Sequence, residues 1–145
     1  MTTPVSNATL TGMPATLASL APWTHALLRI GAGLLFMQHG LQKLFGMFGG
    51  MDGAGATVTL VSQMGVAGVL ETFGGLLLVL GLLTRPVAFL LAGEMLVAFL
   101  QAHLPRGGVP LENGGEVPLL YMLVFLFFVG HGAGPVSLDA RGHRP

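Results

Sequence analysis

Residues 65–104 read GVAGVLETFGGLLLVLGLLTRPVAFLLAGEMLVAFLQAHL and contain two long apolar runs, Gly65–Leu83 and Pro86–Leu104. A helix needs about 17–25 mostly apolar residues to cross the hydrocarbon core of a bilayer, and both runs are long enough. Glu71 and Glu94 nevertheless lie well inside them. An ionised side chain at that depth costs at least a few kcal/mol, so it is rare and usually faces a partner or a polar cavity. The stretch therefore predicts two membrane helices beside a polar interior.

Two further apolar runs, Trp23–Phe48 and Val117–Gly132, extend this pattern, and the first carries Arg29. Charged residues make up 8% of the chain, whereas about 25% is usual in soluble domains. The runs are continuous rather than alternating, which favours helices as the spanning structures. We therefore expect an all-α integral membrane four-helix bundle. Its domain covers residues 23–135, with helices at about 23–48, 65–83, 86–104 and 117–132, a flexible N-terminal tail at 1–22 and a polar C-terminal tail at 136–145.

Composition excludes several classes of function. The formal net charge is +0 and the sequence has no basic run, so the electrostatic footprint of a nucleic-acid-binding protein is missing. The chain has no cysteine, which excludes disulfides, iron–sulfur clusters and thiol redox chemistry carried by this chain.

The positions of Lys and Arg outside the helices indicate an orientation in the membrane. Four helices place both termini on one side, together with Arg85, Arg141 and Arg144, whereas Arg106 and Lys43 lie near the opposite side. Because cytoplasmic segments carry an excess of Lys and Arg, the count favours cytoplasmic termini in a bacterial or archaeal inner membrane.

Alternating helix direction also predicts which polar side chains lie at the same depth. The first and third helices end where the second and fourth begin, and each residue advances about 1.5 Å. This places one group of polar residues in the half of the bundle away from the termini: His39, Lys43, Glu71, His103, Glu116 and Tyr121. Arg29 and Glu94 reach comparable depth in the other half. A polar pocket of this kind can exchange protons, as quinone chemistry requires.

Other interpretations of these residues stay open. Arg29 with Glu94, and Lys43 with Glu71, can be ion pairs that hold the helices in register. His39 and His103 lie at similar depth, as the two axial ligands of a b-type haem would. These histidines with Glu71 and Glu116 have acceptable metal-ligand types, but the sequence has no tight ligand spacing, and we expect no metal. A transporter or channel is a further alternative, although the prolines fall at helix starts or in loops rather than at mid-membrane.

Several spaced motifs resemble those of the DoxX family of small four-helix membrane proteins. The resemblance covers about Leu28–Ala140. It rests on Arg29…Gly33…Phe36…His39-Gly40…Lys43, Glu71-x-x-Gly74-Gly75, Leu80-Gly81-Leu82-x-Thr84-Arg85, Asn113-Gly114-Gly115-Glu116…Tyr121 and Gly132-x-Gly134-Pro135-x-Ser137-Leu138-Asp139. It implies redox work at the quinone pool beside a second subunit, and carries no family-wide catalytic motif onto this chain.

Together these observations predict an integral membrane subunit of a redox complex that binds a quinone, or assists electron transfer to the quinone pool, through this polar pocket. Glu71 and Glu116 would exchange protons, and Tyr121 would orient the ring or an acid. Lys43 and His39 would donate hydrogen bonds to a quinone carbonyl. Further cofactor-binding candidates are Arg29, Glu94 and His103. We expect membrane lipid and other redox subunits as partners, with homo-oligomerisation left open. The rival hypothesis, from a different class, is a non-catalytic anchor or assembly subunit of a larger oxidoreductase.

Overall fold

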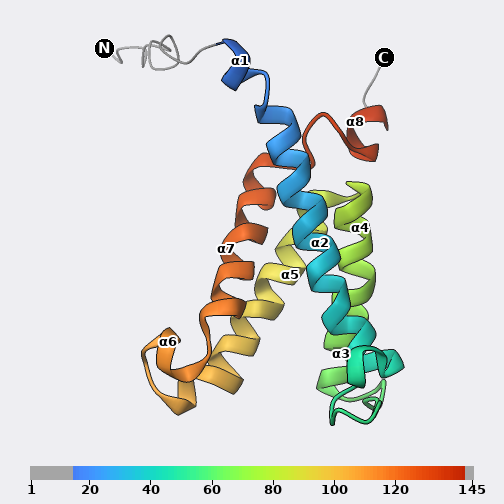
Figure 1. The fold of residues 1–145 in the computed structure, drawn as a ribbon, viewed down its shortest axis with the longest axis vertical. Helices are drawn as coiled ribbons and strands as arrows, with labels where there is room; N and C mark the ends of the chain where they lie inside the picture. Colours follow the sequence, from blue (N-terminus) through green and yellow to red (C-terminus); the bar gives the residue numbers. More distant parts are fainter. Residues whose placement is uncertain (1–14, 143–145) are drawn as a thin grey trace.

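The computed structural model describes residues 15–142, and this part of the chain is helical, without named strands (Figure 1). The prediction of an all-α fold is confirmed for these residues. Of the predicted N-terminal tail, residues 1–14 lie outside the described part. The helices are α1 (Ala15–Ala18), α2 (Ala21–Phe45), α3 (Gln63–Val69), α4 (Gly75–Leu80), α5 (Thr84–Ala98), α6 (Pro110–Asn113), α7 (Glu116–His131) and α8 (Leu138–Gly142).

Two of the long helical segments contain a wider, π-helical turn. Leu70–Gly74 joins α3 to α4, so that Gln63–Leu80 forms one continuous rod. Phe99–His103 continues α5, and a short 3₁₀ turn at Leu104–Arg106 ends that rod. The helical segments Gln63–Leu80 and Thr84–Arg106 begin and end within a few residues of the apolar runs that predict them, Gly65–Leu83 and Pro86–Leu104. The π-helical turns themselves carry no sequence signal of their own.

The long helices pack as two pairs. α2 packs along α3 and α4, and α5 packs along α7, whereas the contact between α2 and α7 is sparse. Glycines bring the first pair close together, because a Cβ on Gly33 would lie 2.7 Å from the Gly75 carbonyl oxygen and a Cβ on Gly75 would lie 2.7 Å from that of Gly33. Small residues at such crossings are typical of membrane helices. The second pair buries larger side chains, among them Leu91, Phe125 and Phe128.

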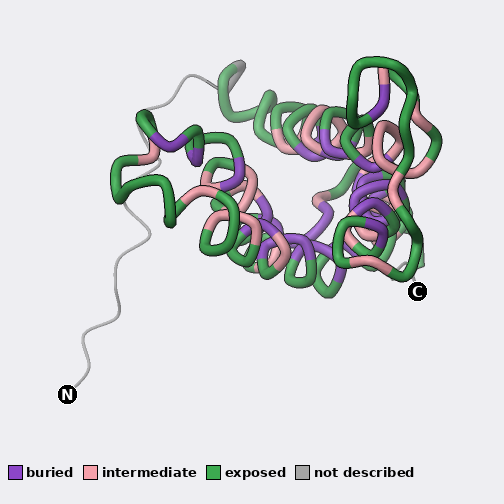
Figure 2. The backbone as a smooth tube through the Cα atoms, turned by 90° about the horizontal axis from the view of Figure 1, so that it is seen from below, coloured by how far each residue is buried: buried purple, intermediate pink, exposed green. Residues whose placement is uncertain are grey.

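The pairs meet near the chain termini and diverge toward the other end (Figure 1). We call these the terminal end, which holds the turn between α4 and α5, and the loop end, which holds the segment 46–62 and α6. Figure 2 shows the buried residues on the sides of the helices that face the middle of the molecule, with exposed residues outside. The divergence leaves space between the pairs at the loop end.

The C-terminal segment, expected as a polar tail, contains α8 and contacts the terminal end. The Asp139 carboxylate accepts hydrogen bonds from the backbone N–H of Leu83 (2.8 Å) and of Thr84 (3.0 Å). These bonds cap the start of α5 and hold Leu83 at a φ of 52°, a left-handed conformation that is costly for a residue with a side chain. Segment 136–142 is therefore part of the fold.

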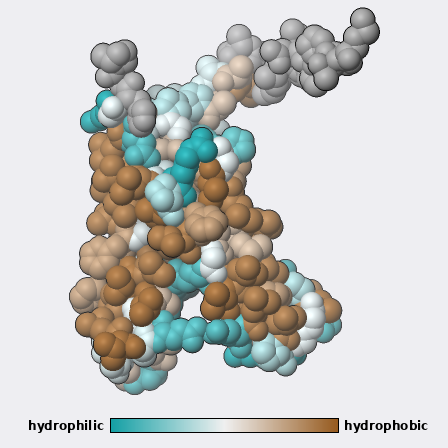
Figure 3. Space-filling view, turned by 180° about the vertical axis from the view of Figure 1, so that it is seen from behind, coloured by the Kyte–Doolittle hydropathy of each residue, from teal (hydrophilic) through white to brown (hydrophobic). Residues whose placement is uncertain are grey.

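The core is apolar, but the surface also carries many large apolar side chains and two ionisable side chains are buried. Arg29 and Glu71 are buried, whereas Leu27, Phe89 and many other large apolar side chains are exposed. Brown, apolar atoms cover much of the face in Figure 3. Two rods, Gln63–Leu80 and Thr84–Arg106, are long and apolar enough to cross a membrane, while Glu116–His131 is apolar but shorter. Two of the four predicted spans thus have the length and apolar composition that a membrane helix needs.

Candidate functional site

A cavity of about 270 Å³ lies between the two helix pairs toward the loop end. The space-filling view shows an opening between the two lobes of the molecule there (Figure 3). α2, the π-helical turn at Leu70–Gly74, the α5 rod and α7 all contribute to its wall. The lining residues are Phe36, His39, Glu71, Met95, Ala98, His103, Gly114, Val117, Pro118 and Tyr121. Four of the predicted site residues, His39, Glu71, His103 and Tyr121, therefore share one cavity.

Aromatic rings form one wall of this cavity. Phe36 is buried, and its ring centroid lies 5.0 Å from that of Tyr121 and 4.9 Å from that of Phe125. The His39 imidazole approaches Tyr121 edge-on, with centroids 6.4 Å apart. Neither the His39 ring nitrogens nor the Tyr121 hydroxyl has a hydrogen-bond partner among residues 15–142. These polar groups are therefore available to a ligand.

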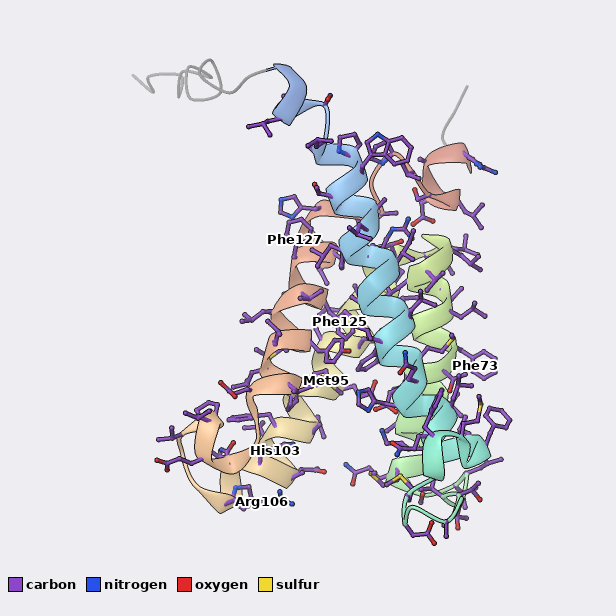
Figure 4. All side chains as sticks on the ribbon, viewed as in Figure 1. Phe73, Met95, His103, Arg106, Phe125 and Phe127 are labelled. Carbon is purple, nitrogen blue, oxygen red and sulfur yellow. The ribbon has the colours of Figure 1, made fainter. Side chains whose placement is uncertain are left out.

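An ion pair lies beside the cavity. The Lys43 Nζ donates to both oxygens of Glu71, at 2.6 and 2.5 Å, and the two side chains are only 13% and 5% exposed. The ion pair that the sequence offered as an alternative is thus present. The π-helical turn gives Glu71 this inward position while Phe73, two residues later, points away from the other helices (Figure 4). Turns of this kind often occur at functional sites.

Glu94 is partly buried, and its carboxyl group has no hydrogen-bond partner among residues 15–142. Both carboxylate oxygens are shielded from solvent and make no hydrogen bond within the described residues. The charges of Glu71 and Lys43 act on it. Burying a carboxyl group without a hydrogen-bond partner costs free energy. Glu94 therefore leaves one polar group unsatisfied toward the loop end.

His103 enters the cavity from the second π-helical turn, near the end of the α5 rod (Figure 4). Its Nδ1 lies 3.0 Å from the Asn113 carbonyl oxygen, a distance that suits an Nδ1–H donor and leaves Nε2 as an acceptor. The Asn113 side chain is buried, donates to the Gly107 carbonyl (2.6 Å) and accepts from the Gly115 N–H (2.7 Å). Asn113 thus fixes the loop that orients His103, a role that the motif Asn113-Gly114-Gly115 alone does not indicate.

The expected pairing of Arg29 with Glu94 is wrong. Arg29 is 1% exposed and lies at the terminal end, where its guanidinium donates to backbone carbonyls. Nε bonds Ala133 (3.0 Å), Nη1 bonds Leu78 and Val79 (2.8 Å to the latter), and Nη2 bonds Val136 (2.6 Å). These carbonyls end α4 and belong to the segment after α7, so depth along the helix was a poor guide to this partner. The contacts give Arg29 a structural role.

Glu116 also departs from the expected cluster. It is exposed at the start of α7 and borders a separate hollow with Pro110, Leu119 and Leu123. The helix turns its side chain away from the cavity that Val117, Pro118 and Tyr121 line. Glu94, rather than Glu116, is therefore the second acid near Glu71. Within residues 15–142 no group of three His, Asp or Glu side chains is placed to hold a metal ion.

Comparisons with known proteins assign the chain to a family. The profile of the DoxX family matches residues 24–104. An "Uncharacterized protein" of Haemophilus influenzae is 42% identical over 127 residues, which cover 83% of this chain and 91% of the relative. The "Putative oxidoreductase CatD" of Bacillus subtilis is 32% identical over 114 residues, which cover 78% of this chain and 82% of the relative. No solved structure gives a significant match. The chain is a member of the DoxX family.

Proposed function

We propose that this protein is an integral membrane subunit of a redox complex in a bacterial or archaeal cytoplasmic membrane, and that its cavity binds the ring of a quinone. The observation that carries the proposal is the composition of the cavity wall. Aromatic and apolar side chains meet two histidines and the Glu71 carboxylate, which is paired with Lys43, in the same hollow. Small-molecule sites are usually apolar pockets with a few converging polar groups. The family membership and the similarity to CatD support a redox role.

The size and chemistry of the cavity suit a substituted six-membered ring. An apolar cavity of about 150 Å³ holds benzene, and this one measures about 270 Å³. Phe36 and Tyr121 offer ring faces and edges for stacking. The His39 imidazole and the Tyr121 hydroxyl offer hydrogen bonds to quinone oxygens. His103 can hydrogen-bond the hydroxyl of the reduced ring through Nε2.

Reduction of a quinone to a quinol consumes two electrons and two protons. In this proposal the electrons come from a partner oxidoreductase, because the chain has no cysteine to carry thiol redox chemistry. Because Glu71 is ionised beside Lys43, both protons pass through Glu94, which gives up one proton and is reprotonated from solvent before it gives up the second. Lys43 holds Glu71 in place, and Glu94 is the nearby acid that no hydrogen bond restrains. In this proposal Glu94 has the proton-exchange role that the sequence predicts for Glu116.

The test is equilibrium binding of 2,3-dimethoxy-5-methyl-1,4-benzoquinone to the purified full-length protein in mild detergent. We expect His39→Ala to weaken binding about tenfold, since a hydrogen bond worth about 1.4 kcal/mol is lost. Glu112→Gln, an exposed change on α6, is the control and should bind like the wild type. If no quinone binds and the protein copurifies with an oxidoreductase, the role of a non-catalytic anchor replaces this proposal.

A further inference from the structure

A second, larger hollow lies on the outer side of the seam between α2 and α7. It measures about 510 Å³ and is lined from α2 by residues that include Leu28, Gly31 and Leu35, and from α7 by Leu120 and Val124. Apart from the Tyr121 hydroxyl, its lining side chains are apolar. Along α2 the groove extends from Leu27 to Leu35, about 12 Å at about 1.5 Å per residue. It is an elongated apolar groove rather than a compact pocket.

The groove and the ring cavity share part of their walls. Tyr121 and Val117 line both. Tyr121 also lines a third, more polar hollow with Gln38, His39 and Gln42. The phenol ring therefore stands where the ring cavity, an apolar groove and a polar hollow come together. The backbones of α2 and α7 make few contacts, and aromatic side chains such as Phe36 and Tyr121 join the two helices at this seam.

We infer that the groove between α2 and α7 holds the hydrocarbon chain of a lipid-soluble quinone whose ring occupies the cavity, with Tyr121 at the neck between them. The inference rests on the proposed function and names its ligand class: a quinone with a long apolar tail rather than a small water-soluble one. The two wall residues that the groove shares with the ring cavity, Val117 and Tyr121, argue for this occupant. A molecule that fills both hollows needs a polar ring at one end and an apolar chain at the other.

The glycines of α2 and α5 provide a matched pair of variants. A Cβ on Gly31 would meet nothing within 4 Å, and the same holds for Gly93. Gly31 lines the groove, whereas Gly93 is exposed on α5 and does not. Gly31→Phe adds an aromatic ring at the groove from a position where the Cβ itself meets open space, and Gly93→Phe controls for the general effect of an added aromatic ring on a helix.

The experiment measures Kd for two probes, 2,3-dimethoxy-5-methyl-1,4-benzoquinone and its 6-decyl derivative. Each variant is compared with the wild type for the same probe, so that partitioning of the decyl compound into detergent cancels. We expect Gly31→Phe to weaken binding of the decyl compound about tenfold through steric exclusion. Its Kd for the tail-free ring should change less than about twofold, and Gly93→Phe should leave both values unchanged.

The outcomes separate the two proposals. If the wild type binds neither probe, the proposed function fails and takes this inference with it. If the tail-free ring binds but Gly31→Phe leaves the decyl compound unaffected, the groove is not the tail site and the ring site stands. If Gly31→Phe instead dissociates an oligomer or a copurifying subunit, measured by sedimentation, the groove is a helix interface and the inference is overturned.

Discussion

The two ends of the molecule treat buried charge in opposite ways. At the terminal end the Arg29 guanidinium lies among the backbone carbonyls of four residues, and Asp139 caps the start of α5. At the loop end Lys43 is paired with Glu71, but Glu94 has no hydrogen bond and the helix pairs separate around a cavity. The buried guanidinium of Arg29 is fully hydrogen-bonded, which indicates a structural role. The Glu94 carboxyl group has no hydrogen bond and lies toward the end that holds the cavity, which favours a functional role. The terminal end also holds one buried group without a partner among residues 15–142, the Thr84 hydroxyl, but that group carries no charge.

We expect the largest loss of stability from Arg29→Ala, at the terminal end. The change leaves several buried carbonyls without donors, each worth about 1–3 kcal/mol, so we expect a loss of stability on the order of 4 kcal/mol. Thermal unfolding in detergent measures it. The control is Arg85→Ala, because Arg85 is exposed and its Nη1 donates to the Val129 carbonyl at 2.9 Å. Equal melting temperatures for the two variants would remove the structural role from Arg29.

The second largest loss of stability is expected at the loop end, when the Lys43–Glu71 ion pair is broken. Lys43→Ala leaves Glu71 buried without its partner, which should cost about 3 kcal/mol. The double variant Lys43→Met/Glu71→Gln removes both charges and should recover most of that stability, because a neutral pair avoids the cost of a lone buried ion. Chemical unfolding of the single and double variants measures the coupling. A double variant no more stable than Lys43→Ala would show that the pair does not act as a unit.

A smaller effect tests the close packing that holds the first helix pair together. Gly33→Ala places a methyl group 2.7 Å from the Gly75 carbonyl oxygen, and overpacking of this kind costs about 1–3 kcal/mol. Gly31→Ala on the same helix meets open space and should stabilise by about 0.5–1 kcal/mol through helix propensity. Melting temperatures that move in opposite directions are expected. A shift of the same sign in both would mean that the two helices are not in close contact at Gly33.

The smallest effect concerns the segment 46–62 beside the cavity. The backbone N–H groups of Ala56 and Ala54 donate to Asp52 Oδ1 and hold the pKa of that carboxyl below its usual value. A depressed pKa means that this contribution to stability is present above the unfolded value, near 3.8, and is lost as the pH falls through the folded value. Amide hydrogen exchange at Ala54, corrected for its intrinsic pH dependence, should show protection at pH 6 that decreases by pH 3. Asp52→Asn, which does not titrate, should abolish the pH dependence.

Much of the architecture is predictable from the sequence because apolar runs define helices directly. The helical segments Gln63–Leu80 and Thr84–Arg106 begin and end near the predicted residues. The similar depth of His39, Glu71, His103 and Tyr121 follows from the alternating direction of the helices. The Lys43–Glu71 pair was predictable for the same reason, since the two residues lie near the same membrane depth on helices that a Gly-rich connection joins.

Other features depend on how each helix is rotated about its own axis. The position of a residue along the helix does not specify this rotation. Glu116 lies at the expected depth but faces a different hollow from that lined by Tyr121. Arg29 finds carbonyls freed at helix ends, and these become visible only once the turn after α4 and the segment after α7 are placed. The π-helical turns that carry Glu71 and His103 shift the rotation of every residue beyond them.

The most direct test of the ring site uses the absence of native cysteine. A single cysteine is introduced by Ala98→Cys, in the cavity wall, or by Ala54→Cys, in the exposed loop, and its rate of labelling by a small maleimide is measured. The decyl quinone is added at saturation, and its fully substituted ring has no free position for a thiol to add to. The account predicts that the quinone slows labelling at Ala98→Cys severalfold and leaves Ala54→Cys unchanged. Equal labelling of Ala98→Cys with and without quinone would contradict it.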